Sequence, residues 1–280
     1  MEKGFFKDEG IAITLKYSGN DDQVFATVIK GQASFGVGDP TFTAISRQRG
    51  FNGKVVATIV GKVAIWGLTN EDKLGVIKNT KDLQGLKIGT FPSPSTNYTL
   101  MKRTIIEDTL TNTKIVQAPI GSQIALLKRN EADIAMELEP ATSLAVSEGY
   151  RVVFSSPAFY GPFSFTGLTT TESVIVNDSI IVQKVVNGLH RAVVFCHTKT
   201  SETIDIASEL FPNLSKEVVK MAVMRMINEE TLPQDVMTVN KAWENAILVR
   251  KEVGDINDTT KIKGSVENKF AIKAKEKYIK

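Results

Sequence analysis

One pattern of residues occurs twice in this chain, about a hundred positions apart. The first copy runs from Gly19 to Pro40 and the second from Gly121 to Pro140. Each consists of a glycine turn, a short amphipathic helix, a turn of small residues, and a buried strand that ends at an acid followed by proline. Gln23 to Pro40 and Gln123 to Pro140 both span 17 positions. Two similar α/β halves predict two lobes that face one cleft, which favours the binding of a small molecule.

Composition narrows the class of protein. The chain has 280 residues, enough for two medium-sized lobes that each bury a core. A net charge of +3 on 34 basic and 31 acidic residues is mild. Nucleic-acid binders cluster basic residues on one face, so no nucleic-acid partner is predicted. The lysine-rich tail, which runs from Lys261 onward, is interpreted as a solvated terminal helix.

Localisation is open at this stage. Cys196 is the single cysteine, so no intrachain disulfide can form and the redox compartment is not revealed. No apolar stretch approaches the 18 or so residues that span a bilayer, and the first six residues do not resemble a signal peptide. The chain as given predicts a cytoplasmic protein. A signal sequence lost upstream would instead predict a periplasmic or cell-surface protein.

Helical and extended patterns alternate along the chain, which predicts an α/β fold with mostly parallel sheets. The predicted strands are residues 11–17, 34–37, 54–60, 63–68, 86–90, 113–117, 133–137 and 151–155, with a further extended run over 159–165. The predicted helices are residues 2–9, 21–30, 41–49, 97–109, 122–129, 180–197, 201–210, 215–228 and 233–253.

Several motifs, in their order along the chain, resemble the solute-binding proteins for nitrate, sulfonates, taurine and thiamine-pyrimidine precursors. The opening run Glu2–Ile11 (EKGFFKDEGI) and the loop Gly36–Pro40 (GVGDP) resemble their first lobe. Asp82–Gly89 (DLQGLKIG), Ser95–Tyr98 (STNY) and Ala132–Ala135 (ADIA) with Glu139–Pro140 resemble their second lobe. The resemblance covers nearly the whole chain. It implies a two-lobed periplasmic-binding-protein type II fold with two crossovers and a ligand clamped between the lobes.

The amino terminus departs from that family. The relatives begin with a strand and a loop ahead of the segment that matches Glu2–Ile11, and this chain has neither. In their first sheet, that strand lies between the strands that match Ile11–Tyr17 and Ser34–Val37. We therefore expect these two segments to lose ladder partners here, which is costly for buried backbone groups. We interpret the missing strand as the result of a truncated or misassigned start of the sequence.

Lobe boundaries follow from the same comparison. The first lobe is predicted as residues 1–84 plus 169–280, and the second as residues 85–168. The crossovers near Gly85 and Thr166–Leu168 are predicted hinges that close the lobes on a ligand.

Polar candidates for ligand contact come from both halves. Asn20 and Asp21 meet the start of a helix, where capping and cleft-facing roles are both open. Asp39 either caps the next helix or contacts ligand, and Gly38 allows close approach to the backbone. The remaining polar candidates end the second repeat's strand or precede a helix whose amino terminus favours an anionic group. These are Ser93, Ser95, Thr96, Glu137 and Glu139.

Aromatic side chains could stack on a flat ligand, although core packing is the more common role for each taken singly. Tyr98 and Phe163 are the candidates retained as ligand-binding residues, and Trp66, Tyr160 and Phe165 share the same chemistry.

Catalysis has little support in the sequence. The fungal thiamine-pyrimidine synthases resemble this fold, but they carry a cysteine-rich motif that is absent here. His190, Cys196 and His197 lie on one predicted helix, and a metal site there would need a third ligand from elsewhere. No nucleophile elbow, zinc-protease motif or phosphate-binding loop occurs. No catalytic residue, cofactor or metal is predicted.

The predicted function is therefore ligand capture for an ABC-type importer, by a monomer that delivers its cargo to a permease. The acids Asp21, Asp39, Glu137 and Glu139 favour an aminopyrimidine over a sulfonate- or nitrate-like anion, because a carboxylate repels an anion unless it is protonated or paired. The alternatives are a cytosolic enzyme or sensor of thiamine-pyrimidine biosynthesis and a binding module without a transporter.

Overall fold

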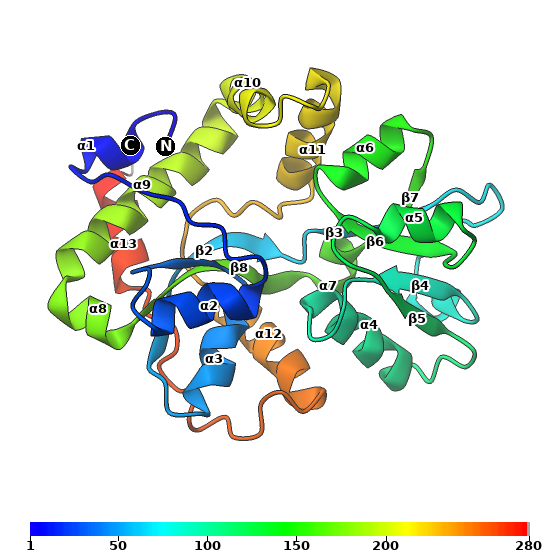
Figure 1. Ribbon diagram of the computed structural model, residues 1–280, viewed down its shortest axis with the longest axis horizontal. Coiled ribbons are helices and arrows are strands. Elements are labelled where there is room, and N and C mark those ends of the chain that lie inside the picture. The colour runs from blue at the N-terminus through cyan, green and yellow to red at the C-terminus, as the bar shows by residue number, and fades with distance from the viewer. Residues whose placement is uncertain (279–280) are drawn as a thin grey trace. The chain divides into compact units, whose positions relative to one another are not determined.

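The computed structural model describes residues 1–278, which form two compact units (Figure 1). Unit 1 comprises Met1–Lys62, Pro162–Ile206 and the chain from Glu230 onward, and unit 2 comprises Val63–Gly161 and Ala207–Glu229. These bounds differ from the predicted lobes. Residues 63–84 join unit 2 because strand β3 (Ile65–Thr69) pairs with two strands of that unit's sheet. Helix α11 (Lys216–Asn228) joins it through an ion pair with Glu139.

The sheet of unit 1 has three strands in the order β1-β8-β2. They are β1 (Gly36–Gly38), β8 (Pro162–Thr171) and β2 (Gly53–Lys62), and both pairings are antiparallel. The prediction of a mostly parallel sheet is wrong for this unit. Alternation of helices and strands indicates parallel neighbours, but β8 comes from a distant part of the chain and lies between β1 and β2.

Ile11–Tyr17 does not form the predicted strand. Among the described residues, β1 pairs only with β8, and no ladder includes residues 11–17. The sequence predicts that this segment lacks ladder partners. Without a hydrogen-bonded neighbour an extended segment is not a stable strand, which explains why residues 11–17 form none. Ile11 and Ile13 instead pack against the apolar core of unit 1.

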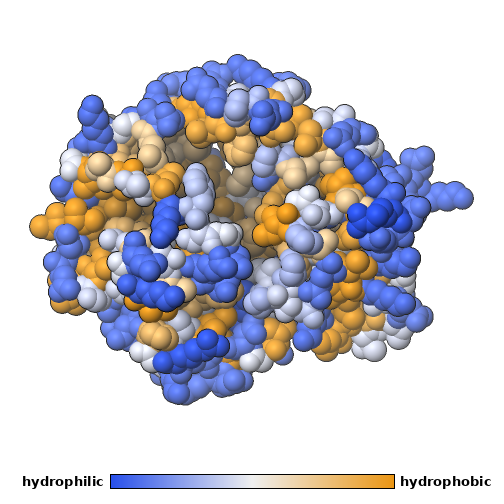
Figure 2. All heavy atoms as spheres, in the orientation of Figure 1, coloured by the Kyte–Doolittle hydropathy of each residue, from blue (hydrophilic) through white to orange (hydrophobic). Residues whose placement is uncertain are grey.

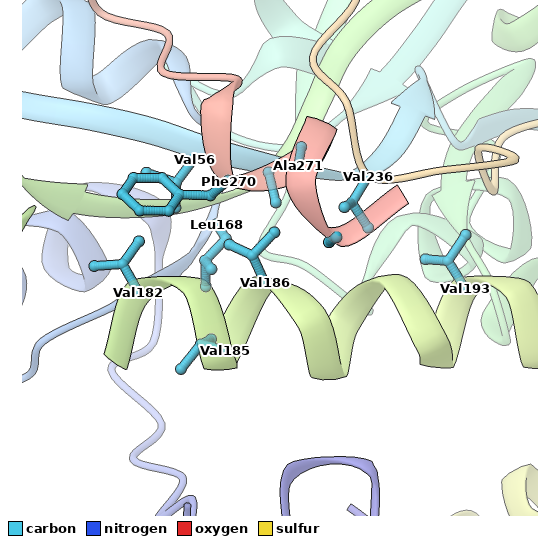
Figure 3. Close-up of a cluster of buried hydrophobic side chains, with 11 residues drawn as sticks. Val56, Leu168, Val182, Val185, Val186, Val193, Val236, Phe270 and Ala271 are labelled. Atoms are coloured by element: carbon cyan, nitrogen blue, oxygen red, sulfur yellow. The ribbon is translucent and has the colours of Figure 1, made fainter. Parts of the chain in front are cut away.

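Helices cover the unit 1 sheet. Their bounds are α1 (Phe5–Asp8), α2 (Asp21–Ile29), α3 (Thr41–Arg47), α8 (Glu172–Asn177), α9 (Ser179–Thr198), α12 (Asn240–Glu252) and α13 (Lys269–Tyr278), and α10 (Thr200–Leu210) continues past the unit's bound at Ile206. Val182, Val186 and Val193 point from α9 toward Phe270 and Val236 (Figure 3). This apolar cluster holds α9 and α13 against the sheet.

The sheet of unit 2 has five strands in the order β5-β4-β6-β3-β7. Their bounds are β4 (Lys87–Thr90), β5 (Lys114–Gln117), β6 (Ile134–Leu138) and β7 (Arg151–Ser155), in addition to β3. β4 is parallel to β5 and β6, whereas β3 is antiparallel to β6 and β7. The helices of this unit are η1 (Thr80–Leu83), α4 (Thr96–Glu107), α5 (Gln123–Lys128), α6 (Ala141–Ser147), α7 (Ser156–Tyr160) and α11.

The repeated pattern in the sequence corresponds to a repeated structure. In unit 1 it forms α2 and β1, and in unit 2 it forms α5 and β6; the next helices, α3 and α6, begin directly after the prolines. In both copies the acid–proline pair joins the strand to the following helix. The predicted α/β units are confirmed.

Two other local predictions differ from the structure. The helix predicted over residues 233–253 begins only at Asn240, and the extended run over 159–165 is split between α7 and β8. Residues 166–168, predicted as a hinge, lie inside β8, where Gly167 and Leu168 pair with both β1 and β2 and Thr166 pairs with β2. Hydrophilic side chains cover much of the surface in Figure 2, with apolar ones scattered among them. No helix among residues 1–278 is long and apolar enough to cross a bilayer.

Candidate functional site

The carboxyl ends of three parallel strands meet at one edge of the unit 2 sheet. The register aligns Gly89 of β4 with Ala135 of β6 and with Val116 of β5. The segment that leaves β4 toward α4 therefore starts level with the end of β6, where Glu137 lies. In α/β sheets this edge is where ligands bind.

The start of α4 is held by its own hydroxyl residues and by β5. Ser95 Oγ accepts a hydrogen bond from the Tyr98 amide at 3.2 Å and caps the helix. The Ser93 amide donates to Gln117 Oε1 at 2.7 Å. The structure thus brings the candidates Ser93, Ser95, Thr96 and Tyr98 together at the amino terminus of a 12-residue helix, where free N–H groups favour polar or anionic groups.

Glu137 is a buried acid at the same edge. Its side chain accepts a hydrogen bond from the Leu138 amide at 2.9 Å, and no ion pair to it occurs within residues 1–278. Burial raises the pKa of Glu137 to about 7. A carboxyl group with this pKa is partly protonated at neutral pH and can both donate and accept hydrogen bonds.

Glu139, two residues further along the chain, differs from Glu137 because its carboxylate forms an ion pair. Its Oε1 lies 2.7 Å from Arg225 Nε, and its carboxylate also accepts from the Ser143 amide and hydroxyl. Arg225 in turn lies over the ring of Trp66. Glu139 therefore caps α6 and neutralises an arginine.

The same arrangement exists in unit 1. Asp39 Oδ2 lies 2.8 Å from Arg250 Nη2, and its Oδ1 accepts from the Thr41 amide and hydroxyl at 2.8 and 2.6 Å. The Asp39 and Arg250 side chains are both buried. Arg250 also pairs with Asp255 at 2.9 Å. Both carboxylate oxygens of Asp39 are thus engaged by protein groups.

Of the two candidate acids in unit 1, Asp39 is paired with Arg250, whereas Asp21 forms no ion pair within residues 1–278. Its Oδ1 accepts the Asp39 amide at 2.9 Å, and burial of the carboxyl group and the charge of Asp39 raise its pKa. Gly38 makes room for this carboxylate, because a Cβ there would lie 2.5 Å from Asp21 Oδ1. Asn20 caps α2 through a hydrogen bond from the Gln23 amide.

The aromatic candidates divide by burial. Trp66 and Phe163 are fully buried, in unit 2 and unit 1 respectively. Trp66 Nε1 donates to Glu229 Oε1 at 2.9 Å. The Tyr160 hydroxyl pairs with Thr104, and burial raises its pKa to about 12. Tyr98 and Phe165 are half-buried.

The histidines and the cysteine do not assemble into a reactive site. Cys196 is half-buried, and burial raises the pKa of its thiol, which disfavours the nucleophilic thiolate. His197 Nε2 forms a hydrogen bond with the Pro233 carbonyl oxygen at 2.9 Å. No group of three metal-ligating side chains was found among the residues that the structure describes.

Sequence reasoning missed the two arginines that neutralise Asp39 and Glu139. Arg250 is 211 positions from its partner and Arg225 is 86 positions away. Neither lies in a motif, so only the tertiary fold reveals the pairing.

Solved structures show the class of fold. The chain resembles the periplasmic aliphatic sulphonate binding protein SsuA from Escherichia coli, at 17% identity and TM-score 0.66, over 82% of this chain and 72% of that one. It also resembles the ligand binding component of an ABC-type import system from Staphylococcus aureus, at 15% identity and TM-score 0.73, over 96% and 93% of the two chains. The desulfurization enzyme DSZB shares the fold as well, at 12% identity and TM-score 0.70, over 99% and 94%. The chain has the periplasmic-binding-protein fold, which binding proteins and an enzyme share.

The family follows from the sequence. The model of the NMT1/THI5-like family matches residues 1–203 of the 280, and the chain belongs to that family. No curated protein matches it.

Proposed function

We propose that this protein is the solute-binding component of an ABC-type importer, which captures a small polar ligand and releases it unchanged to a permease. The observation that carries the proposal is the carboxyl edge of β4, β5 and β6, where the start of α4 and the buried acid Glu137 lie together. Membership in the NMT1/THI5-like family and the named binding proteins of the same fold support it. Its proposed location is the periplasm or cell surface, and it acts as a monomer.

Two of the four candidate acids are neutralised within the protein, Asp39 by Arg250 and Glu139 by Arg225. The preference for an aminopyrimidine now depends on Asp21 and Glu137. A protonated Glu137 could accept from an amine and donate to a ring nitrogen, whereas an ionised one would repel nitrate or a sulfonate. Asn20, Gly38, Tyr98 and Phe163 remain proposed contacts.

A thermal-shift panel on the whole chain tests the proposal. The panel holds aminopyrimidines, short alkyl sulfonates, taurine, nitrate, bicarbonate and pyridoxal phosphate. A ligand at 100 times its dissociation constant should raise the free energy of unfolding by about 2.7 kcal/mol. A shift with an aminopyrimidine or a sulfonate supports the proposal and selects the ligand class. A shift with pyridoxal phosphate alone favours the synthase alternative, and no shift with any compound contradicts ligand capture of this class.

A further inference from the structure

Asn97, in the first turn of α4, has a buried side chain that lacks hydrogen-bond partners. The residue is 4% exposed. Neither Oδ1 nor Nδ2 has a hydrogen-bond partner within residues 1–278. A buried polar group without a partner costs about 1–3 kcal/mol of stability. An amide with both ends unpaired is therefore a feature that folding alone disfavours.

The rest of the same helix face does not share this cost. Asn97, Met101 and Thr104 recur at the spacing of one face of a helix, and all three are buried. Thr104 Oγ1 is satisfied by the Tyr160 hydroxyl at 3.1 Å, and Met101 is apolar. Asn97, the member nearest the amino terminus, is the one left unpaired.

Its position places Asn97 near the candidate site. It follows Ser95 and Thr96 in the chain, at the sheet edge that also holds Glu137. A carboxamide offers one acceptor and two donors. An oxyanion could satisfy its N–H groups but would leave Oδ1 unpaired. An edge with an acceptor beside an N–H donor satisfies both atoms, as in the pairing of asparagine with adenine.

We propose that Asn97 is a specificity-determining residue that reads an aminoheterocycle through both atoms of its carboxamide. Nδ2–H donates to a ring nitrogen, and Oδ1 accepts from the adjacent exocyclic amine. Because the amide is enclosed by protein, binding through it requires neighbouring groups to move when the ligand enters. The inference rests on the proposed function.

The substitution Asn97→Leu separates a binding role from a structural role. Leucine has the same number and branching of side-chain heavy atoms and no polar atoms, so it removes the unpaired amide without leaving a cavity. If Asn97 serves binding, Asn97→Leu should leave the melting temperature unchanged or higher, while affinity for 4-aminopyrimidine falls about ten- to a hundredfold. If Asn97 serves only the fold, for instance by holding a buried water, the melting temperature should fall and affinity should follow stability alone.

The ligand gives a second control. 4-(Dimethylamino)pyrimidine keeps the ring nitrogens but lacks the N–H donor. Calorimetric titration of wild type and Asn97→Leu with both compounds gives a double-mutant cycle. The expected result is that wild type strongly prefers 4-aminopyrimidine and the variant does not. Wild-type binding of taurine or another panel compound without this preference would overturn the inference and leave the proposed function standing. Failure of wild type to bind any panel compound would overturn both.

Discussion

Asp39 and Arg250 form an ion pair in the interior of unit 1, with 2.8 Å between Oδ2 and Nη2 and side chains that are 5% and 2% exposed. Glu139 and Arg225 repeat the relationship in unit 2, with the arginine more exposed. In each unit the acid precedes a proline and also accepts hydrogen bonds from the following helix. The paired acids thus fix the junction between strand and helix in both copies of the repeat.

Breaking the buried pair should be costly. Arg250→Met leaves Asp39 buried without its cation, and we expect the free energy of unfolding to fall by about 3–5 kcal/mol. Arg225→Met should cost less, because Arg225 is more exposed. Denaturation with urea measures both. The double variant Asp39→Asn with Arg250→Met should recover part of the loss, and no recovery would contradict the pairing as the cause.

Gly38 should not tolerate a side chain. Gly38→Ala places a Cβ against the Asp21 carboxylate, and we expect a loss of about 1–3 kcal/mol as the hydrogen bond to the Asp39 amide is displaced. Gly61→Ala is the matched control, because its nearest contact would be an ordinary 3.6 Å. Asp21→Ala in the Gly38→Ala background should relieve the clash. If the two substitutions were simply additive, the predicted clash would be absent.

Glu137 should make stability depend on pH near neutrality. Its pKa is raised from 4.5 to about 7 in the folded state, so its favourable neutral form is lost as pH rises through 7. Glu137→Gln cannot ionise, and its stability relative to wild type should therefore rise between pH 4.5 and 8, by at most about 3 kcal/mol. Urea denaturation across this range measures the difference. A constant difference at all pH values would show that Glu137 does not titrate there.

Glu9 should make stability depend on pH in the opposite sense to Glu137. Burial opposes its charge, but hydrogen bonds from Tyr278, Asn187 and Lys277 outweigh burial and lower its pKa. Stability from Glu9 is present above pH 4.5 and is lost as pH falls below it. Glu9→Gln should therefore be less stable than wild type at pH 7, with the difference shrinking toward pH 3. Glu2→Gln, at an exposed position, is the control and should change nothing.

The sequence predicted those parts of the fold that local signals determine. The spacing from Gln23 to Pro40, repeated from Gln123 to Pro140, places α2 and β1 and their counterparts α5 and β6 correctly, whereas helix α6 was not predicted. Local patterns do not carry the pairing of distant segments. The antiparallel insertion of β8 and the membership of α11 in unit 2 therefore required the structure.

The candidate site likewise has features that the sequence predicts and features that only tertiary contacts reveal. The start of α4 and Glu137 were predicted from a turn and a strand end, and the register places them at one sheet edge. The engagement of Asp39 and Glu139 could not be predicted, because their arginines are far along the chain. The unpaired amide of Asn97 also left no trace in the sequence, because an asparagine in a first helical turn is ordinary there.

Reversible capture is tested most directly by equilibrium dialysis of the purified chain against the ligand that gives the largest thermal shift, with mass spectrometry of both compartments. The prediction is saturable binding of one ligand per chain, with the ligand recovered unchanged after long incubation. Conversion of the ligand to a new mass, or the absence of saturable binding, would contradict it.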